Sequence, residues 1–191
     1  MNTKLLGALG MIGAPFFLLA FIPGTPWYAQ EQDTSLQGLF CLIYMLGWMC
    51  SILGLMQLRA TGTSRWGRFV LIMELVFLSL ANCWNTWNIL QIDTDSSLYL
   101  MLDLTWPLSN AWMLVIAITI IVTNKLTSWR RWIPLIVALW LPFGLSMVLG
   151  IGRNNTTLLL PGIYSAIAWF LLGYMVWSAP TNTKDKLLAL G

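Results

Sequence analysis

The stretch at residues 98–132, LYLMLDLTWPLSNAWMLVIAITIIVTNKLTSWRRW, decides the fold of this chain. Its apolar part, 98–122, has about the 20 residues that an α-helix needs to cross roughly 30 Å of hydrocarbon. The basic residues Lys125, Arg130 and Arg131 follow at once. Lys and Arg in short loops are retained on the cytoplasmic side of a membrane. The stretch therefore predicts a transmembrane helix that ends in the cytoplasm.

Five other apolar stretches of similar length occur along the chain. They lie at residues 5–22, 36–58, 69–90, 133–151 and 157–177. Hydrophobic residues make up 58% of the chain and charged residues 9%, which excludes an ordinary soluble domain. The loops are too short to fold by themselves. We expect an all-α polytopic membrane protein, with six transmembrane helices in one bundle and a single domain over 1–191.

The distribution of charge orients this bundle. With the N-terminus inside, nine of the ten Lys and Arg residues fall on the inner face, and Arg153 alone falls outside. The nine are Lys4, Arg59, Arg65, Arg68, Lys125, Arg130, Arg131, Lys184 and Lys186. The acidic residues Glu31, Asp33, Asp93 and Asp95 fall in outer loops. This distribution predicts that both termini are cytoplasmic.

The third and fourth apolar stretches carry most of the polar residues found within spans. In the third, Glu74, Asn85 and Asn88 share one helical face with Ala81, and Asn82 lies to one side. In the fourth, Asp103, Pro107 and Asn110 share one face, and Trp106 flanks it. One wall of each helix is therefore expected to face protein or water rather than lipid.

A short loop joins these two spans, so we expect them to be neighbours. Their side chains would then line one polar recess that opens outward. The predicted ligand-binding residues are Asn82, Asn85, Asn88, Asp103, Trp106 and Asn110. Amides, an indole face and a carboxylate suit an amphiphilic ligand with hydroxyl, amide or cationic groups. The alternative is that the amides bond one another across helices as packing.

Glu74 has two interpretations. It lies about two turns from Arg68, so it could pair with a basic residue of an inner loop. Alternatively, it takes part in a proton or ion step, because an ionisable group within a span is a functional candidate.

The sequence also excludes several kinds of site. There is no histidine, which removes histidine zinc sites, the usual haem ligand and His-based catalysis. We therefore expect no cofactor, no metal and no catalytic residue set. Basic residues are spread over separate segments, so no nucleic-acid partner is expected.

Three functions remain open. The first is a membrane protein that binds or transports a small amphiphilic or polar ligand, and its small size favours a homodimer. The second is a non-catalytic accessory subunit that docks a membrane-protein partner. The third, least favoured, is a lipid-modifying enzyme with Asp103 or Glu74 as base, since no second catalytic group is placed to help. The chain is similar in size to the small six-span proteins of bacterial inner membranes, which predicts that location, with membrane lipids as partners.

Overall fold

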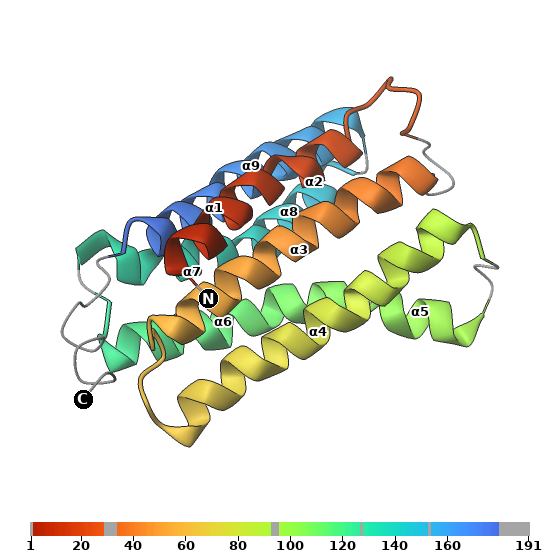
Figure 1. Cartoon of the computed structure of the whole chain (residues 1–191). Helices are drawn as coiled ribbons and strands as arrows, with labels where there is room; N and C mark the ends of the chain where they lie inside the picture. The colour runs from red at the N-terminus through yellow and green to blue at the C-terminus, as the bar shows by residue number, and fades with distance from the viewer. Residues whose placement is uncertain (1, 29–33, 93–95, 127, 153, 180–191) are drawn as a thin grey trace.

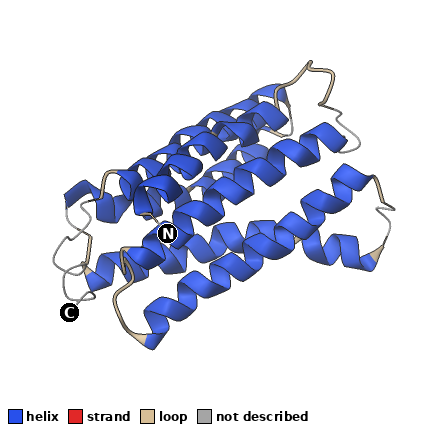
Figure 2. Cartoon of the chain, viewed as in Figure 1, coloured by secondary structure: helices blue, strands red, loops and turns tan. Residues whose placement is uncertain are grey.

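The protein is seen in a computed structural model that describes residues 2–28, 34–92, 96–126, 128–152 and 154–179. Within these ranges, six helical segments are long and apolar enough to cross a membrane. They are α1 (Thr3–Gly13) with α2 (Pro15–Ala20), α3 (Ser35–Gln57), α4 (Arg65–Leu90), α5 (Ser97–Asp103) with α6 (Thr105–Thr123), the 3₁₀ helix η1 (Ser128–Trp132) with α7 (Ile133–Ala138) and α8 (Trp140–Ile151), and α9 (Asn155–Trp177). Every regular element among the described residues is a helix (Figure 2). The predicted all-α fold is confirmed, and it indicates an integral membrane protein.

The helix boundaries follow capping residues. The Ser64 hydroxyl accepts a hydrogen bond from the Gly67 amide at 3.0 Å, so α4 begins four residues before the predicted start at 69. Asn154 and Thr157 bond each other's backbone reciprocally at the start of α9. Elsewhere the helices begin and end within a few residues of the predicted spans.

Three of the spans are divided near a proline. α2 begins at Pro15, directly after Ala14. The breaks at Leu104 and Leu139 each lie three residues before a proline. Proline has no N–H to donate, and its ring crowds the carbonyl four residues earlier, which interrupts a helix at that place. Pro161 differs, because α9 continues through it.

The six spans form a closed ring in which each contacts the next along the chain and α9 returns to α1. In Figure 1, α1, α2 and α9 lie on one side, α4 to α6 on the other, and α3 runs between them. α3 also contacts α9, which places it at the centre. The indole N–H of Trp112 donates to the Val70 carbonyl at 2.9 Å and joins α6 to α4. The expected proximity of spans three and four is therefore confirmed.

Span 1 is held against its neighbours by close contacts at glycine. A Cβ added at Gly173 of α9 would lie 2.6 Å from the Met11 nitrogen, and one at Gly13 would lie 2.8 Å from the Gly47 Cα. These are backbone atoms, so no side-chain movement relieves such contacts. Lipid gives little hydrophobic drive for helix association, and close packing replaces it.

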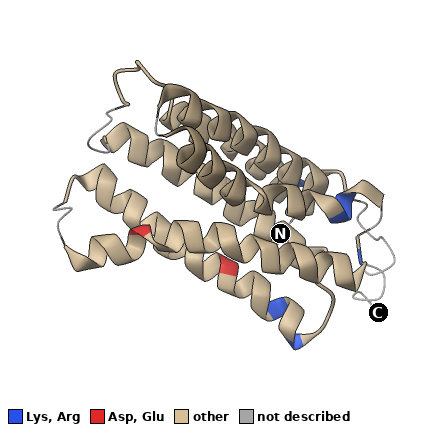
Figure 3. Ribbon diagram, turned by 180° about the vertical axis from the view of Figure 1, so that it is seen from behind, with Lys and Arg blue, Asp and Glu red and all other residues tan. Residues whose placement is uncertain are grey.

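The described basic side chains gather at one end of the ring (Figure 3). They are Lys4, Arg59, Arg65, Arg68, Lys125, Arg130 and Arg131, all placed there by the alternating direction of the spans. We call this the basic end. The predicted positions of Glu31, Asp33, Asp93, Asp95, Arg153, Lys184 and Lys186 lie outside the described residues.

We predict that Gly173→Ala lowers the thermal midpoint of the protein in detergent. The added methyl group forces α9 away from α1, and overpacking of this kind costs roughly 1–3 kcal/mol. Gly150→Ala in α8 is the matched control, because nothing lies within 4 Å of its added Cβ. A melting curve for each variant measures the effect. Equal midpoints for the two variants would contradict the close contact of α1 with α9.

Candidate functional site

Glu74 lies inside the bundle, on the face of α4 that turns towards α6. Its side chain is 0% exposed. The Ser109 hydroxyl donates a hydrogen bond to Glu74 Oε1 at 2.7 Å, while Glu74 Oε2 has no hydrogen-bond partner. Within the described residues, the side chain that hydrogen-bonds this carboxylate is thus the neutral Ser109 rather than a Lys or Arg. A charged group in hydrocarbon is costly, and one hydroxyl compensates only part of that cost.

The next residue of α6, Asn110, is also buried and incompletely bonded. Its Nδ2 donates to the Trp106 carbonyl one turn earlier, at 3.0 Å, and its Oδ1 has no partner. The indole N–H of Trp106 has no acceptor either. We call Glu74, Ser109, Asn110 and Trp106 the polar centre. It contains two unpaired acceptor atoms and one unpaired donor.

Aromatic rings from five helices surround one side of this centre. The aromatic cluster comprises Phe17, Tyr44, Trp48, Trp106, Trp140 and Trp169. The Trp106 ring lies 5.2 Å from that of Trp140, edge to face, and 5.7 Å from that of Phe17. Trp48 and Trp169 meet edge to face at 4.9 Å. These are the separations at which aromatic pairs attract one another.

Tyr44 joins α3 to α9 within the aromatic cluster. Its ring lies 5.6 Å from that of Trp169, and its hydroxyl accepts a hydrogen bond from the Ser165 hydroxyl at 3.2 Å. The aromatic cluster reaches the polar centre through Trp106, which stands on α6 three residues before Ser109.

The indole groups of the aromatic cluster differ in how their N–H groups are satisfied. Trp140 donates to the Pro161 carbonyl at 2.8 Å. The N–H groups of Trp48, Trp106 and Trp169 have no acceptor, although Trp48 and Trp169 are each only 1% exposed. Buried polar groups are nearly always hydrogen-bonded, and leaving one unpaired costs about 1–3 kcal/mol. The centre of the bundle thus retains hydrogen-bonding capacity of both kinds.

Two of the predicted ligand-binding amides face α3 instead of the fourth span. Asn82 Nδ2 donates to the Met49 sulfur and Asn85 Nδ2 to the Met45 sulfur, each at 3.3 Å. Asn85 Nδ2 also lies 3.3 Å from Asn82 Oδ1. Thioether sulfur is a weak acceptor, so these amides are only weakly satisfied. The Oδ1 atom of the buried Asn85 has no partner.

The remaining predicted residues lie towards the end of the bundle opposite the basic end. The Tyr99 hydroxyl of α5 donates to Asn88 Oδ1 at 3.0 Å. Asp103 is the last residue of α5 and is partly exposed. It stands six residues before Ser109, or about 9 Å by helical rise. Asp103 and Glu74 are therefore at different depths, as the sequence predicts.

The predicted face of α4 is confirmed, because Glu74, Ala81, Asn85 and Asn88 are all buried. The six predicted ligand-binding residues nevertheless lie in separate places, and their role in binding stays a prediction. The structure joins Glu74 to Ser109 of α6, which lies next to Asn110 in the chain. Sequence reasoning missed Ser109, because helical periodicity does not say which residue of a neighbouring helix a buried side chain meets.

In the described residues, no group of three or more His, Cys, Asp or Glu side chains is placed to hold a metal ion. No protein-family model matches the chain, and no curated protein or solved structure is significantly similar to it.

We predict that Ser109→Ala lowers the free energy of unfolding by about 1–3 kcal/mol, because it removes the hydrogen bond to a buried carboxylate. The matched control is Ser146→Ala in α8, since Ser146 is exposed and bonds only the local Phe143 carbonyl. Equilibrium unfolding in mixed micelles measures both variants. If Ser109→Ala is as stable as Ser146→Ala, then Ser109 does not support Glu74.

Proposed function

We propose that this chain is an integral protein of a bacterial inner membrane that binds or transports a small amphiphilic or polar ligand. The ligand would place a cationic, hydroxyl or amide group at the polar centre. One observation carries the proposal: the Glu74 carboxylate is fully buried and has one oxygen without a hydrogen-bond partner in the described residues. Its other oxygen is bonded by Ser109, three residues after Trp106 of the aromatic cluster.

The cost of burying Glu74 supports a functional role over packing. Insertion of an acidic side chain at the middle of a span costs about 2.5–3.5 kcal/mol, so such residues face cavities or partners and mark ligand or ion pathways. A glutamine at this position would accept the same bond from Ser109 at a lower cost. A protein that needed only to join α4 to α6 would gain nothing from the carboxylate.

The unpaired atoms define the chemistry of the ligand. Glu74 Oε2 and Asn110 Oδ1 accept hydrogen bonds, and the Trp106 indole donates one. Aromatic faces attract cations when the site is dry. A ligand with an ammonium group or other N–H or O–H donors for the two oxygens, a hydroxyl or carbonyl oxygen that accepts from Trp106, and an apolar body satisfies all of these features.

Asp103 and the amides of α4 fit a supporting role in this proposal. Asp103 is partly exposed and ends α5, before α6 runs through Ser109 towards the basic end, so it lies on the side of the polar centre away from that end. A carboxylate there attracts a cation before it reaches Glu74. Asn82, Asn85 and Asn88 would line the adjoining part of the route, in keeping with an outward-opening recess.

The orientation that this function requires is testable. The gathering of Lys and Arg at the basic end predicts cytoplasmic termini. A green fluorescent protein fused to the C-terminus is expected to fluoresce in a bacterial host, and alkaline phosphatase fused there is expected to be inactive. Active phosphatase with a dark fluorescent fusion would reverse the orientation.

Binding at the polar centre is tested by native mass spectrometry of gently solubilised protein. We expect wild-type protein to carry a non-lipid mass, and Glu74→Gln and Asn110→Ala to lose at least nine-tenths of it. A tenfold weaker affinity corresponds to about 1.4 kcal/mol. Asn155→Ala, an exposed amide in the first turn of α9, is the control for Asn110→Ala.

Two outcomes would contradict ligand binding at this place. If Glu74→Gln and Asn110→Ala retain the bound mass, the ligand lies elsewhere. If wild-type protein carries only phospholipid, but a protein partner co-purifies and is lost in Glu74→Gln, the chain is an accessory subunit.

A further inference from the structure

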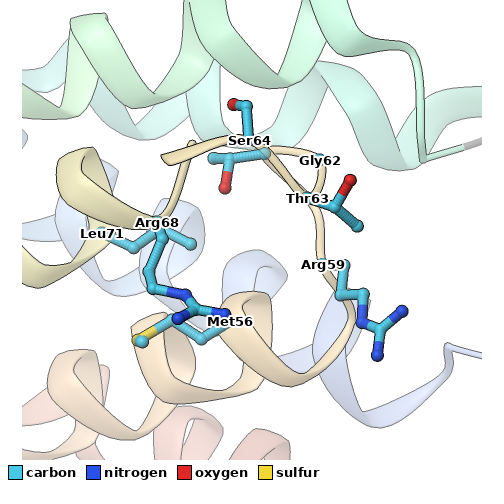
Figure 4. A pocket seen from close by; sticks show the side chains of 8 residues that line it. Met56, Arg59, Gly62, Thr63, Ser64, Arg68 and Leu71 are labelled. Carbon is cyan, nitrogen blue, oxygen red and sulfur yellow. The ribbon is translucent and has the colours of Figure 1, made fainter. Parts of the chain in front are cut away.

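A second polar feature lies at the basic end, well away from the polar centre. The loop between α3 and α4 encloses a pocket of about 350 Å³ (Figure 4). It is lined by Met56, Arg59, Thr61, Gly62, Thr63, Ser64, Arg68 and Leu71. Small-molecule pockets are roughly 300–1,000 Å³ in volume, so this one has room for a ligand of modest size.

The loop around the pocket is fixed by its own hydrogen bonds. The Ala60 amide donates to the Leu55 carbonyl at 3.0 Å, and the Thr61 hydroxyl donates to the Gly67 carbonyl at 2.7 Å. From α6, the Thr123 hydroxyl donates to the Ala60 carbonyl at 3.2 Å. These bonds join the loop to three helices, so the pocket wall is preorganised.

Gly67 allows the loop to cross close over the start of α4. A Cβ at this position would overlap the backbone of Thr61, so only glycine fits there. Arg59 itself has φ +49°, a left-handed conformation that is uncommon for a residue with a side chain. The conformation turns the chain at the end of α3 and directs Arg59 to the wall of the pocket.

Two guanidinium groups stand across this pocket from each other. Arg68 extends from α4 beside Met56, and Arg59 leaves the loop on the other side (Figure 4). Both side chains are exposed, and neither has an ion pair or hydrogen bond within the described residues. The pocket lining contains no acidic residue. Its charge is therefore positive and uncompensated by the lining.

The pocket is also amphipathic and lies where a lipid headgroup would lie. Met56 and Leu71 give it an apolar part, and the hydroxyls of Thr63 and Ser64 lie on the polar side. Exposed Trp66, in the first turn of α4, marks the boundary between hydrocarbon and water. Guanidinium groups bind phosphate oxygens in pairs, and basic pockets between transmembrane helices bind anionic headgroups.

We propose that this pocket binds the phosphate group of an anionic phospholipid, with Arg59 and Arg68 as its ligands and Met56 and Leu71 against the start of the acyl chains. Thr63 donates a further hydrogen bond to the phosphate. The choice of a lipid over a soluble phosphate follows from the apolar part of the pocket and its place at the ends of two spans.

The test is a titration of the purified full chain, in neutral detergent, with short-chain phosphatidylglycerol and with short-chain phosphatidylcholine. We expect phosphatidylglycerol to bind more tightly, and the double variant Arg59→Gln, Arg68→Gln to weaken its binding at least tenfold. The double variant Arg65→Gln, Lys125→Gln is the charge-matched control, because both residues are exposed at the same end and neither lines the pocket. It is expected to change the affinity less than threefold.

Three results would overturn the proposal. Equal weakening in the two double variants would show general attraction by surface charge. Equal affinity for phosphatidylglycerol and phosphatidylcholine would show that the pocket does not select an anionic lipid. Displacement of phosphatidylglycerol by millimolar inorganic phosphate would assign the pocket to a soluble phosphate. If Arg59→Gln, Arg68→Gln weakens phosphatidylglycerol binding but keeps the non-lipid mass expected at Glu74, the two sites are independent.

Discussion

The contact of glycine backbones along span 1 is the constraint on which the arrangement of the other spans depends. Gly13 meets Gly47 of α3, and Gly173 of α9 meets Met11. These contacts pack both α3 and α9 closely against α1, and α3 and α9 also contact each other. Because backbones meet there, the large side chains of α3 and α9 are directed elsewhere. Trp48 and Trp169 accordingly lie on the inside, where they meet each other.

A closed ring creates an interior that a pair of helices does not have. Backbone groups are satisfied within the helices, so the interior is left for side chains. Aromatic rings occupy much of this interior, and the indole rings contribute N–H donors as well as apolar surface. Ser109 and Asn110 enter the same interior from α6. A carboxylate on α4 thus finds a polar neighbour inside the bundle, whereas the hydrocarbon of a bilayer would offer it none.

The sequence predicts this fold well because the signals are strong and local. Apolar runs of the right length, separated by short polar turns, leave few alternatives. The buried face of α4 also follows from periodicity, which groups Glu74 with Asn85 and Asn88. Periodicity assigns residues to a face but does not say which neighbouring helix that face meets.

The candidate site is harder to predict for that reason. α4 contacts both α3 and α6, and its polar face is divided between them. Asn82 and Asn85 turn to methionines of α3, whereas Glu74 turns to Ser109 of α6. Methionine sulfur and a single serine carry no periodic signal that would identify them as partners.

The separation of charge along the bundle argues that Glu74 acts on something that enters. Every described basic residue lies at the basic end, and the described spans contain only Glu74 and Asp103 as acidic groups. Ser109 supplies a hydrogen bond but no positive charge. An ionised carboxylate at the polar centre requires a counter-charge in a medium where charges interact strongly. The described part of the protein supplies none there. Under the proposed function, the cationic group of the ligand would supply it, and the occupancy of the polar centre would be coupled to the charge of Glu74.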